Sequence, residues 1–203
     1  MSLKINVKVG EINNLSDARY CAGMGVEMVG FSLIEENPKF LPFAKIIEIS
    51  NWLNGVKLVG EVKFLDQNTV DILNTVPFDY IQFNYDVLNK DKYGLVNIPL
   101  ILKIDVDKEL QNIENILKNN SDHVALFLFE SNRDIYSDEE LLIELCKKYK
   151  IYLAYNCSQD NLGIILNSIK PAGISMNGGN EIKPGLMNFE HLSTILELLD
   201  SED

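Results

Sequence analysis

Residues 7–31, VKVGEINNLSDARYCAGMGVEMVGF, have the pattern of a strand, a helix and a second strand. The first apolar run ends at Gly10, and a helix start is indicated at Ser16 and Asp17. Gly25 marks the end of this helix, just before the next apolar run. The stretch therefore predicts a βαβ unit with parallel strands, whose first strand ends at a residue without a side chain.

The same alternation continues along the rest of the chain. Eight short apolar runs are separated by amphipathic stretches, which predicts a small (β/α)8 TIM barrel near the lower size limit of that fold. A doubly wound open sheet is the alternative, although it normally has fewer strands at this length. The predicted strands are INVKV from Ile5, EMVGFSL from Glu27, VKLVGEVKF from Val56, YIQFN from Tyr80, LILKIDV from Leu100, HVALFLF from His123, IYLAY from Ile151 and AGISM from Ala172.

Three of the later helices differ in how clearly the sequence marks where they begin. Ser137, which three acidic residues follow, is expected to open one helix. Asn188 is expected to cap the last helix, whose apolar face begins at Phe189. Residues 86–95, DVLNKDKYGL, predict only a turn or two of the fourth helix.

Length, composition and charge limit the class of protein. The chain has 203 residues, 46% of them hydrophobic, and a formal net charge of −12, which predicts one barrel domain over residues 1–203. The acidic balance and the lack of a basic run argue against nucleic acid and membrane surfaces as partners. No apolar segment reaches the roughly 20 residues of a membrane span, and the N-terminus lacks a signal-peptide profile, so we expect a cytoplasmic protein.

The cysteines indicate neither a disulfide framework nor a metal site. Cys21, Cys146 and Cys157 are odd in number and widely spaced, with no CxxC pair. We expect Cys21 and Cys146 to be buried on apolar helix faces. The sequence indicates no cofactor.

Three ungapped blocks at the ends of predicted strands resemble one family. Residues 8–18, KVGEINNLSDA, are similar to the family pattern KICGITNLEDA, and residues 30–41, GFSLIEENPKFL, to GFVFYPKSPRYV. Residues 170–188, KPAGISMNGGNEIKPGLMN, are similar to KPYGVDVSSGVEKSPGVKD. On these residues the chain resembles the phosphoribosylanthranilate isomerases of tryptophan biosynthesis, which are barrels of the ribulose-phosphate-binding type.

The resemblance implies an aldose-to-ketose Amadori isomerisation of an N-linked phosphoribose. A general acid protonates the ring oxygen of the sugar, and a general base removes the proton from its second carbon. In the family the base is the cysteine of the first block, and here Gly10 takes its place. The family's acid is an aspartate at the end of the sixth strand, where this chain has Glu130.

Two other carboxylates are candidates for the missing base. Glu11 is the nearest, if the loop turns its side chain inward, and Glu61 interrupts the third strand where the family has an uncharged residue. In one interpretation Glu11 is exposed and Glu61 pairs with a lysine such as Lys63 or Lys8. In the other, both converge with Glu130 at the barrel mouth for a changed chemistry or a cation.

The resemblance also implies positions that bind substrate. Lys39 stands where the family's arginine meets the anthranilate carboxylate, and Asn84 where it has a histidine. Phosphate in the family is held by backbone N–H groups of the loops after the seventh and eighth strands. Tyr155 in the seventh loop either leaves room for the phosphate or fills the pocket. The candidate phosphate-binding residues are Asn156 and Ser158 in the seventh loop, and Asn177, Gly178, Gly179 and Asn180 in the eighth.

Other charged residues near the predicted strand ends are ambiguous. Arg133, in place of a glycine-rich family stretch, indicates either new chemistry or a surface residue. Lys103 and Asp105 belong either to the site or to an internal ion pair. His191 is expected to be an exposed helix residue.

Two functions therefore stay open. The first is an isomerase of the phosphoribosylanthranilate type with altered catalytic residues. The second is a non-catalytic barrel, derived from that isomerase, which binds a phosphorylated sugar or a protein partner. We expect a small phosphorylated sugar as substrate or ligand, and a monomer or homodimer.

Overall fold

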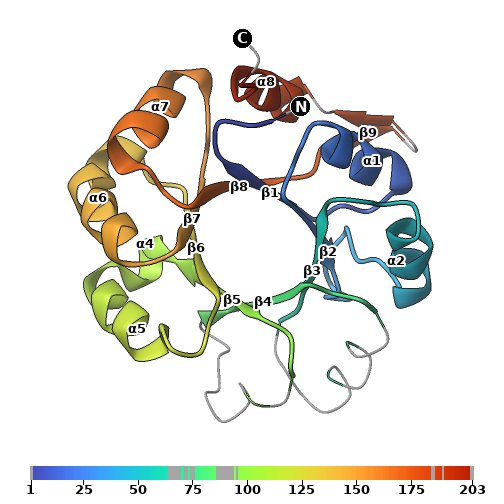
Figure 1. Cartoon of the computed structure of the whole chain (residues 1–203), viewed down its shortest axis with the longest axis horizontal. Helices are drawn as coiled ribbons and strands as arrows, with labels where there is room; N and C mark the ends of the chain where they lie inside the picture. The colour runs from blue at the N-terminus through green and yellow to red at the C-terminus, as the bar shows by residue number, and fades with distance from the viewer. Residues whose placement is uncertain are drawn as a thin grey trace.

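The chain forms a closed barrel of eight parallel strands in the order of the sequence (Figure 1). This computed structural model describes residues 2–63, 70, 73, 76–85, 94, 96–183, 186–188 and 190–201. All eight predicted strands are confirmed, and the open-sheet alternative is excluded by the pairing of β1 with β8. The strands are β1 (Asn6–Gly10), β2 (Met28–Ser32), β3 (Lys57–Glu61), β4 (Tyr80–Asn84), β5 (Leu100–Asp105), β6 (Leu126–Ser131), β7 (Ile151–Tyr155) and β8 (Gly173–Asn177).

Helices surround the ring of strands on the outside (Figure 1). None of the described helices has both the length and the apolar character that crossing a membrane requires. The region predicted for the fourth helix falls almost entirely outside the described residues. The α-helices are α1 (Leu15–Gly23), α2 (Phe43–Ser50), α4 (Val106–Glu109), α5 (Ile113–Asn120), α6 (Glu139–Lys148), α7 (Gln159–Ile164) and α8 (Glu190–Leu198), with the 3-10 helices η3 (Leu110–Asn112) and η4 (Ile135–Asp138) and the π-helix η5 (Ile165–Ile169).

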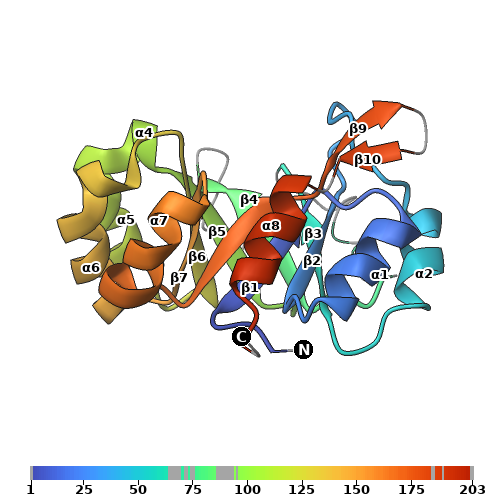
Figure 2. The ribbon, with the colours of Figure 1, turned by 90° about the horizontal axis from the view of Figure 1, so that it is seen from above.

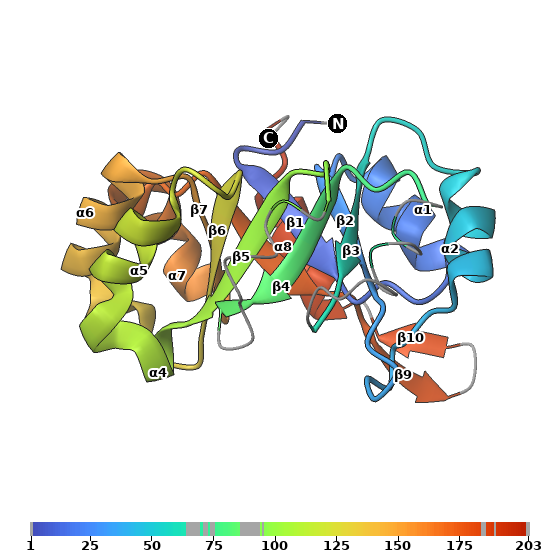
Figure 3. The same ribbon diagram turned by 90° about the horizontal axis from the view of Figure 1, so that it is seen from below.

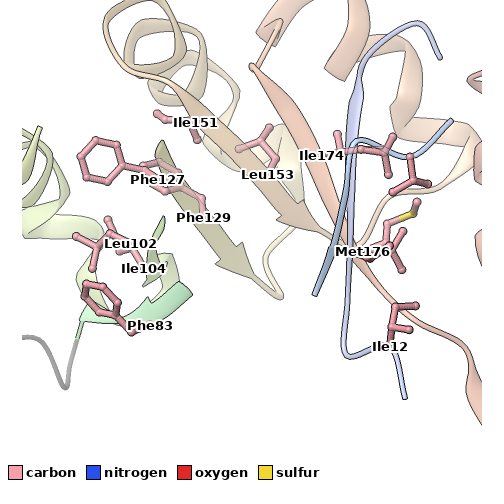
Figure 4. Close-up of a cluster of buried hydrophobic side chains, with 14 of the residues drawn as sticks. Ile12, Phe83, Leu102, Ile104, Phe127, Phe129, Ile151, Leu153, Ile174 and Met176 are labelled. Atoms are coloured by element: carbon pink, nitrogen blue, oxygen red, sulfur yellow. The ribbon is translucent and has the colours of Figure 1, made fainter. Parts of the chain in front are cut away.

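Alternation along each strand divides the core into two layers. Outward-facing side chains such as Phe83, Phe129 and Leu153 pack between the barrel and its helices (Figure 4). The intervening residues point into the lumen, where a second cluster includes Val59 and Tyr152. The lumen is therefore a packed core, with polar groups toward both ends of the strands.

The first helix begins earlier than the sequence signal indicated. Asn14 is the N-cap residue of α1, and its Oδ1 accepts a hydrogen bond from the backbone N–H of Asp17 at 2.9 Å. Ser16 and Asp17, predicted to open the helix, lie in its first turn. Asn14 has the same capping ability as serine and aspartate, so the pattern left the choice among these residues open. Gly25, at φ 78°, confirms the predicted end of this segment.

A short antiparallel pair of strands follows the barrel. β9 (Asn180–Lys183) pairs with β10 (Leu186–Asn188) and projects beside α1 (Figures 2 and 3). This pair was not predicted, although the Pro-Gly dipeptide between the strands is a turn signal. Asn188, expected to cap the last helix, lies in β10, and Phe189 falls outside the described residues.

The amino-terminal end of the barrel is closed by a polar cluster. The Tyr152 hydroxyl donates a hydrogen bond to Glu27 Oε2, and Lys57 Nζ lies 2.8 Å from Glu27 Oε1. Gly173 makes room for the tyrosine, because a Cβ at Gly173 would lie 2.5 Å from its ring. This end therefore serves stability and leaves the opposite end for chemistry.

Candidate functional site

A cavity of about 790 Å³ opens at the carboxyl ends of the strands. This is the end where (β/α)8 barrels carry their active sites. Its wall comes from the loop after β1, from the ends of β6, β7 and β8, and from the start of α8. The polar residues that line it include Glu11, Lys39, Glu130, Asn156, Asn177 and His191.

The space beside Gly10 is taken by a carboxylate from another strand. A Cβ added at Gly10 would lie 2.7 Å from Oε1 of Glu61. A Cβ added at Gly30, on the strand between them, would lie 2.2 Å from the same atom. Real Cβ atoms do not approach oxygen so closely. Gly10 and Gly30 therefore form the space that the Glu61 carboxylate fills.

Glu61 is buried, and each of its two oxygens accepts a hydrogen bond. Its Oε1 accepts a hydrogen bond from Lys8 Nζ at 2.6 Å, and the side chains of Lys8 and Glu61 are 2% and 9% exposed. Its Oε2 accepts the backbone N–H of Glu11 at 3.2 Å. Of the two lysines suggested by the sequence, Lys8 is the partner. Breaking such a pair leaves an uncompensated buried charge, which makes each partner depend on the other.

Glu11 also lines the cavity. Its φ of 55° is unusual for a residue with a side chain and turns the strand end sharply. The carboxylate lines the cavity and accepts a hydrogen bond from Asn37 Nδ2 at 2.9 Å. The loop thus turns this side chain inward, whereas the interpretation as a solvent-exposed residue does not hold.

Glu130 reaches the same cavity from β6. Its Oε1 lies 2.7 Å from Lys103 Nζ, and its side chain is 44% exposed. Asp105 pairs instead with Lys108 at 2.7 Å. Lys103 therefore belongs to the mouth of the barrel as the partner of Glu130, while Asp105 serves the start of α4, where it accepts the Lys108 N–H.

The loop after β6 is fixed by a separate charged cluster. Arg133 Nε donates to both carboxylate oxygens of Asp138, at 3.1 and 3.0 Å, and the Tyr155 hydroxyl donates to Asp138 Oδ2 at 3.0 Å. Asp138 and Tyr155 are both buried. Arg133 therefore anchors the loop, and Tyr155, which lines the cavity, holds Asp138 through its hydroxyl.

A cysteine also lines the cavity but is not suited to proton transfer. Burial raises the pKa of the Cys157 thiol to about 12. The thiol is therefore protonated near neutral pH and does not replace the family's cysteine. Burial has the same effect on Cys21 and Cys146; Cys21 is buried as expected, and Cys146 is half-buried.

The eighth loop makes its bonds within the protein. The Gly178 N–H donates to the Gly10 carbonyl at 2.8 Å. Lys39 Nζ donates to the carbonyls of Gly178 and Gly179, at 2.8 and 3.1 Å. Lys39 thus reaches the cavity from the loop after β2 while it holds the eighth loop. Asn177 lines the cavity, and the backbone of Asn180 enters β9.

The seventh loop places its two candidates differently. Asn156 lines the main cavity, and its carbonyl accepts Asn161 Nδ2 at 3.0 Å. Ser158 is the N-cap residue of α7 and lines a neighbouring hollow, its N–H donating to Asn161 Oδ1 at 2.8 Å. Asn84 also lies outside the main cavity, in smaller hollows beside it.

His191 lines the cavity, although the sequence indicated no role for it in the site. It is exposed and lies in the first turn of α8, as expected, and its Nε2 is 2.9 Å from the Cys157 carbonyl oxygen. Its position at the start of the last helix was the available signal, because barrels often bind ligands at the start of a helix after the eighth strand.

Comparisons with known proteins agree with the barrel. No protein-family model matches the chain. The N-(5'-phosphoribosyl)anthranilate isomerase of Sulfurihydrogenibium sp. is 25% identical over 205 residues, covering 95% of this chain and 98% of the relative. The enzyme of the same name from Aquifex aeolicus is 24% identical over 209 residues, covering 98% and 100%.

Solved structures give the same result. Phosphoribosyl anthranilate isomerases from Thermotoga maritima and Thermus thermophilus align with TM-scores of 0.76 and 0.77, at 19% and 18% identity. Each alignment covers 95% of this chain and 97% of the solved chain. Over nearly its whole length the chain is therefore similar to the phosphoribosylanthranilate isomerases, and in this chain the place beside residue 10 is filled by Glu61 from β3.

Proposed function

We propose that the chain is an aldose–ketose isomerase of the phosphoribosylanthranilate type. The observation that carries this proposal is that Glu11 and Glu130 line one cavity at the carboxyl ends of the barrel strands. An isomerisation of this kind needs an acid and a base on the same substrate. Relatives of nearly the same length bear the name of this activity.

Glu130 is the acid in this proposal. It stands at the end of β6, as the family's aspartate does, and Lys103 Nζ lies 2.7 Å from its Oε1. Protonation of the ring oxygen breaks its bond to the first carbon, while the substrate nitrogen forms a double bond to that carbon. A second carboxylate then removes the proton from the second carbon, and Glu11 and Glu61 are the described carboxylates nearest to residue 10.

The substrate in this proposal is a small phosphorylated sugar that carries an aromatic amine. One solved phosphoribosyl anthranilate isomerase contains reduced 1-(o-carboxyphenylamino)-1-deoxyribulose 5-phosphate. In this chain Lys39 supplies a positive charge to the cavity, while Asn177 and His191 add hydrogen-bonding groups. A dimer is a further expectation, since a Thermotoga maritima relative is described as dimeric.

A non-catalytic barrel is the second candidate. It is favoured by the eighth loop, where the Gly178 N–H and the Lys39 ammonium bond to the protein's own carbonyls. Such a barrel binds the sugar phosphate or a protein partner without converting it.

Turnover with a Glu130 variant separates the two candidates. Phosphoribosylanthranilate is generated in situ, and its fluorescence decay is followed with wild type and Glu130→Gln. We expect Glu130→Gln to lower kcat by about 10²- to 10⁴-fold, because glutamine cannot deliver a proton. Glu144→Gln, which removes an exposed carboxylate paired with Lys148, is the matched control. Equal decay with wild type and Glu130→Gln would favour the non-catalytic barrel.

A further inference from the structure

We propose that Glu61, supplied by β3, is the base of this reaction, and that Lys8 is the residue that positions it. The inference rests on the proposed function and deepens it. The base then comes from the third strand of the barrel instead of the first. Its carboxylate lies in the space left by Gly10.

The first support is where the carboxylate lies. Oε1 of Glu61 is 2.7 Å from the point where a Cβ of residue 10 would lie. A side chain at residue 10 would start from this point, so the carboxylate occupies the location of the group that it replaces. Gly30 on β2 leaves room for the Glu61 side chain to reach this point from β3, because any Cβ at residue 30 would overlap Glu61.

The second support is nearness to the cavity. Asn177 Oδ1 lies 3.3 Å from the same Cβ point at Gly10, and Asn177 lines the cavity. Glu61 does not line the cavity itself, and its carboxylate lies behind the wall that Asn177 forms. In the proposal, the second carbon of the substrate approaches Asn177 to meet this carboxylate.

The third support is an unpartnered polar atom beside Glu61. Gln82 pairs in register with Glu61, and by strand alternation both side chains face the lumen. Gln82 is only 8% exposed, yet its Oε1 has no hydrogen-bond partner among the described residues. A buried acceptor of this kind is costly unless a donor reaches it, and the hydroxyl groups of a sugar are suitable donors.

The hydrogen bonds of Glu61 favour it over Glu11 as the base. Lys8 and the Glu11 N–H hold its two oxygens in a fixed orientation, and each oxygen keeps a further lone pair. Glu11 accepts its bond from Asn37, in the loop after β2. Glu11 therefore contributes its backbone N–H to this arrangement, while its side chain is held by Asn37.

The proton balance of the step is simple. Glu130 gives one proton to the ring oxygen, and Glu61 accepts one from the second carbon, whose electrons form the enolamine double bond. The enol hydroxyl then loses a proton as the first carbon gains one, which yields the ketone. Solvent returns the proton from Glu61 to Glu130, so the protein ends in its starting state.

The test compares kcat and KM of wild type, Glu61→Gln, Glu11→Gln and the surface control Glu144→Gln. We expect Glu61→Gln to lower kcat by about 10²- to 10⁴-fold with KM within a few-fold, and Glu11→Gln to lower it less. Lys8→Met should lower kcat while KM stays close to wild type, as expected of a positioning residue. Loss in Glu11→Gln with wild-type turnover in Glu61→Gln would overturn the proposal.

A double variant keeps the test valid if Glu61→Gln fails to fold. Lys8→Met with Glu61→Gln removes both buried charges together, so no unpaired charge remains. We expect it to bind reduced 1-(o-carboxyphenylamino)-1-deoxyribulose 5-phosphate in calorimetry within a few-fold of wild type, without turnover. If this variant turns over as fast as wild type, the proposed role of Glu61 is overturned and the proposed function stands. If wild type itself is inactive, the proposed function is overturned as well.

A gain of activity offers an independent check. In Glu61→Val, the further change Gly10→Cys returns the family's cysteine to a space that Glu61 no longer fills. Lys8 Nζ, 3.0 Å from the Cβ point, would favour the thiolate there. We expect the double variant to turn over faster than Glu61→Val alone, and equal rates would count against a shared place for the two bases.

Discussion

At the scale of single residues, Gly10 and Glu61 behave as one unit. Gly10→Cys places a Cβ 2.7 Å from Glu61 Oε1, so overpacking should lower the free energy of unfolding by about 1–3 kcal/mol. Glu61→Val also destabilises, because it leaves Lys8 buried without its partner. We expect the double variant to lose less than the sum of the two single losses, since Glu61→Val removes the clash and the cysteine supplies a partner for Lys8. Urea unfolding of the four proteins measures this coupling, and strictly additive losses would contradict it.

At the scale of elements, the loop after β6 is tied to β7 and α6 through Asp138. Tyr155→Phe removes one hydrogen bond to this buried carboxylate, so we expect a loss of about 1.5–3 kcal/mol in the free energy of unfolding. Tyr136→Phe is the matched control, because that exposed hydroxyl bonds only a backbone carbonyl, of Asp160. Urea midpoints at unchanged slope give the comparison. Equal effects in the two variants would show that Asp138 does not depend on Tyr155.

At the scale of the whole molecule, the two ends of the barrel have separate tasks. Burial works to raise the pKa of the Glu27 carboxyl, but hydrogen bonds from Lys57 and Tyr152 outweigh it and hold the pKa below its ordinary 4.5. This stabilisation is present above pH 4.5 and is lost as the pH falls through the lowered pKa. Glu27→Gln should therefore be less stable than wild type at pH 7, by about 1–3 kcal/mol. The deficit should shrink in acid, while turnover at the opposite end stays unchanged.

Thermal unfolding of wild type and Glu27→Gln across pH checks this prediction. Lys45→Gln is a suitable control, because its ion pair with Glu48 is exposed on α2 and should contribute little at any pH. A deficit that stays constant from pH 7 into acid would show that Glu27 does not titrate with folding.

The barrel was predictable because its signal is local, whereas the site depends on contacts between distant segments. Each strand is marked by a short apolar run. The lone carboxylate within such a run indicated that Glu61 needed a partner. The overlap of Glu61 with Gly10 could not be read from the sequence, because it depends on the register of β1, β2 and β3. The bonds of Lys39 and His191 depend on loop conformation, which no periodicity encodes.

The two glycines also limit the order in which such a site can arise. Gly30 coincides with a glycine of the family pattern, whereas residues 10 and 61 differ from it. A carboxylate that enters at residue 61 while residue 10 still bears a side chain must share its space with that side chain. On the proposed role of Glu61, we therefore expect the side chain at residue 10 to be lost first, through an intermediate with neither base. Laboratory evolution back to the cysteine should pass the same low-activity intermediate in reverse, with Glu61 leaving before the cysteine returns.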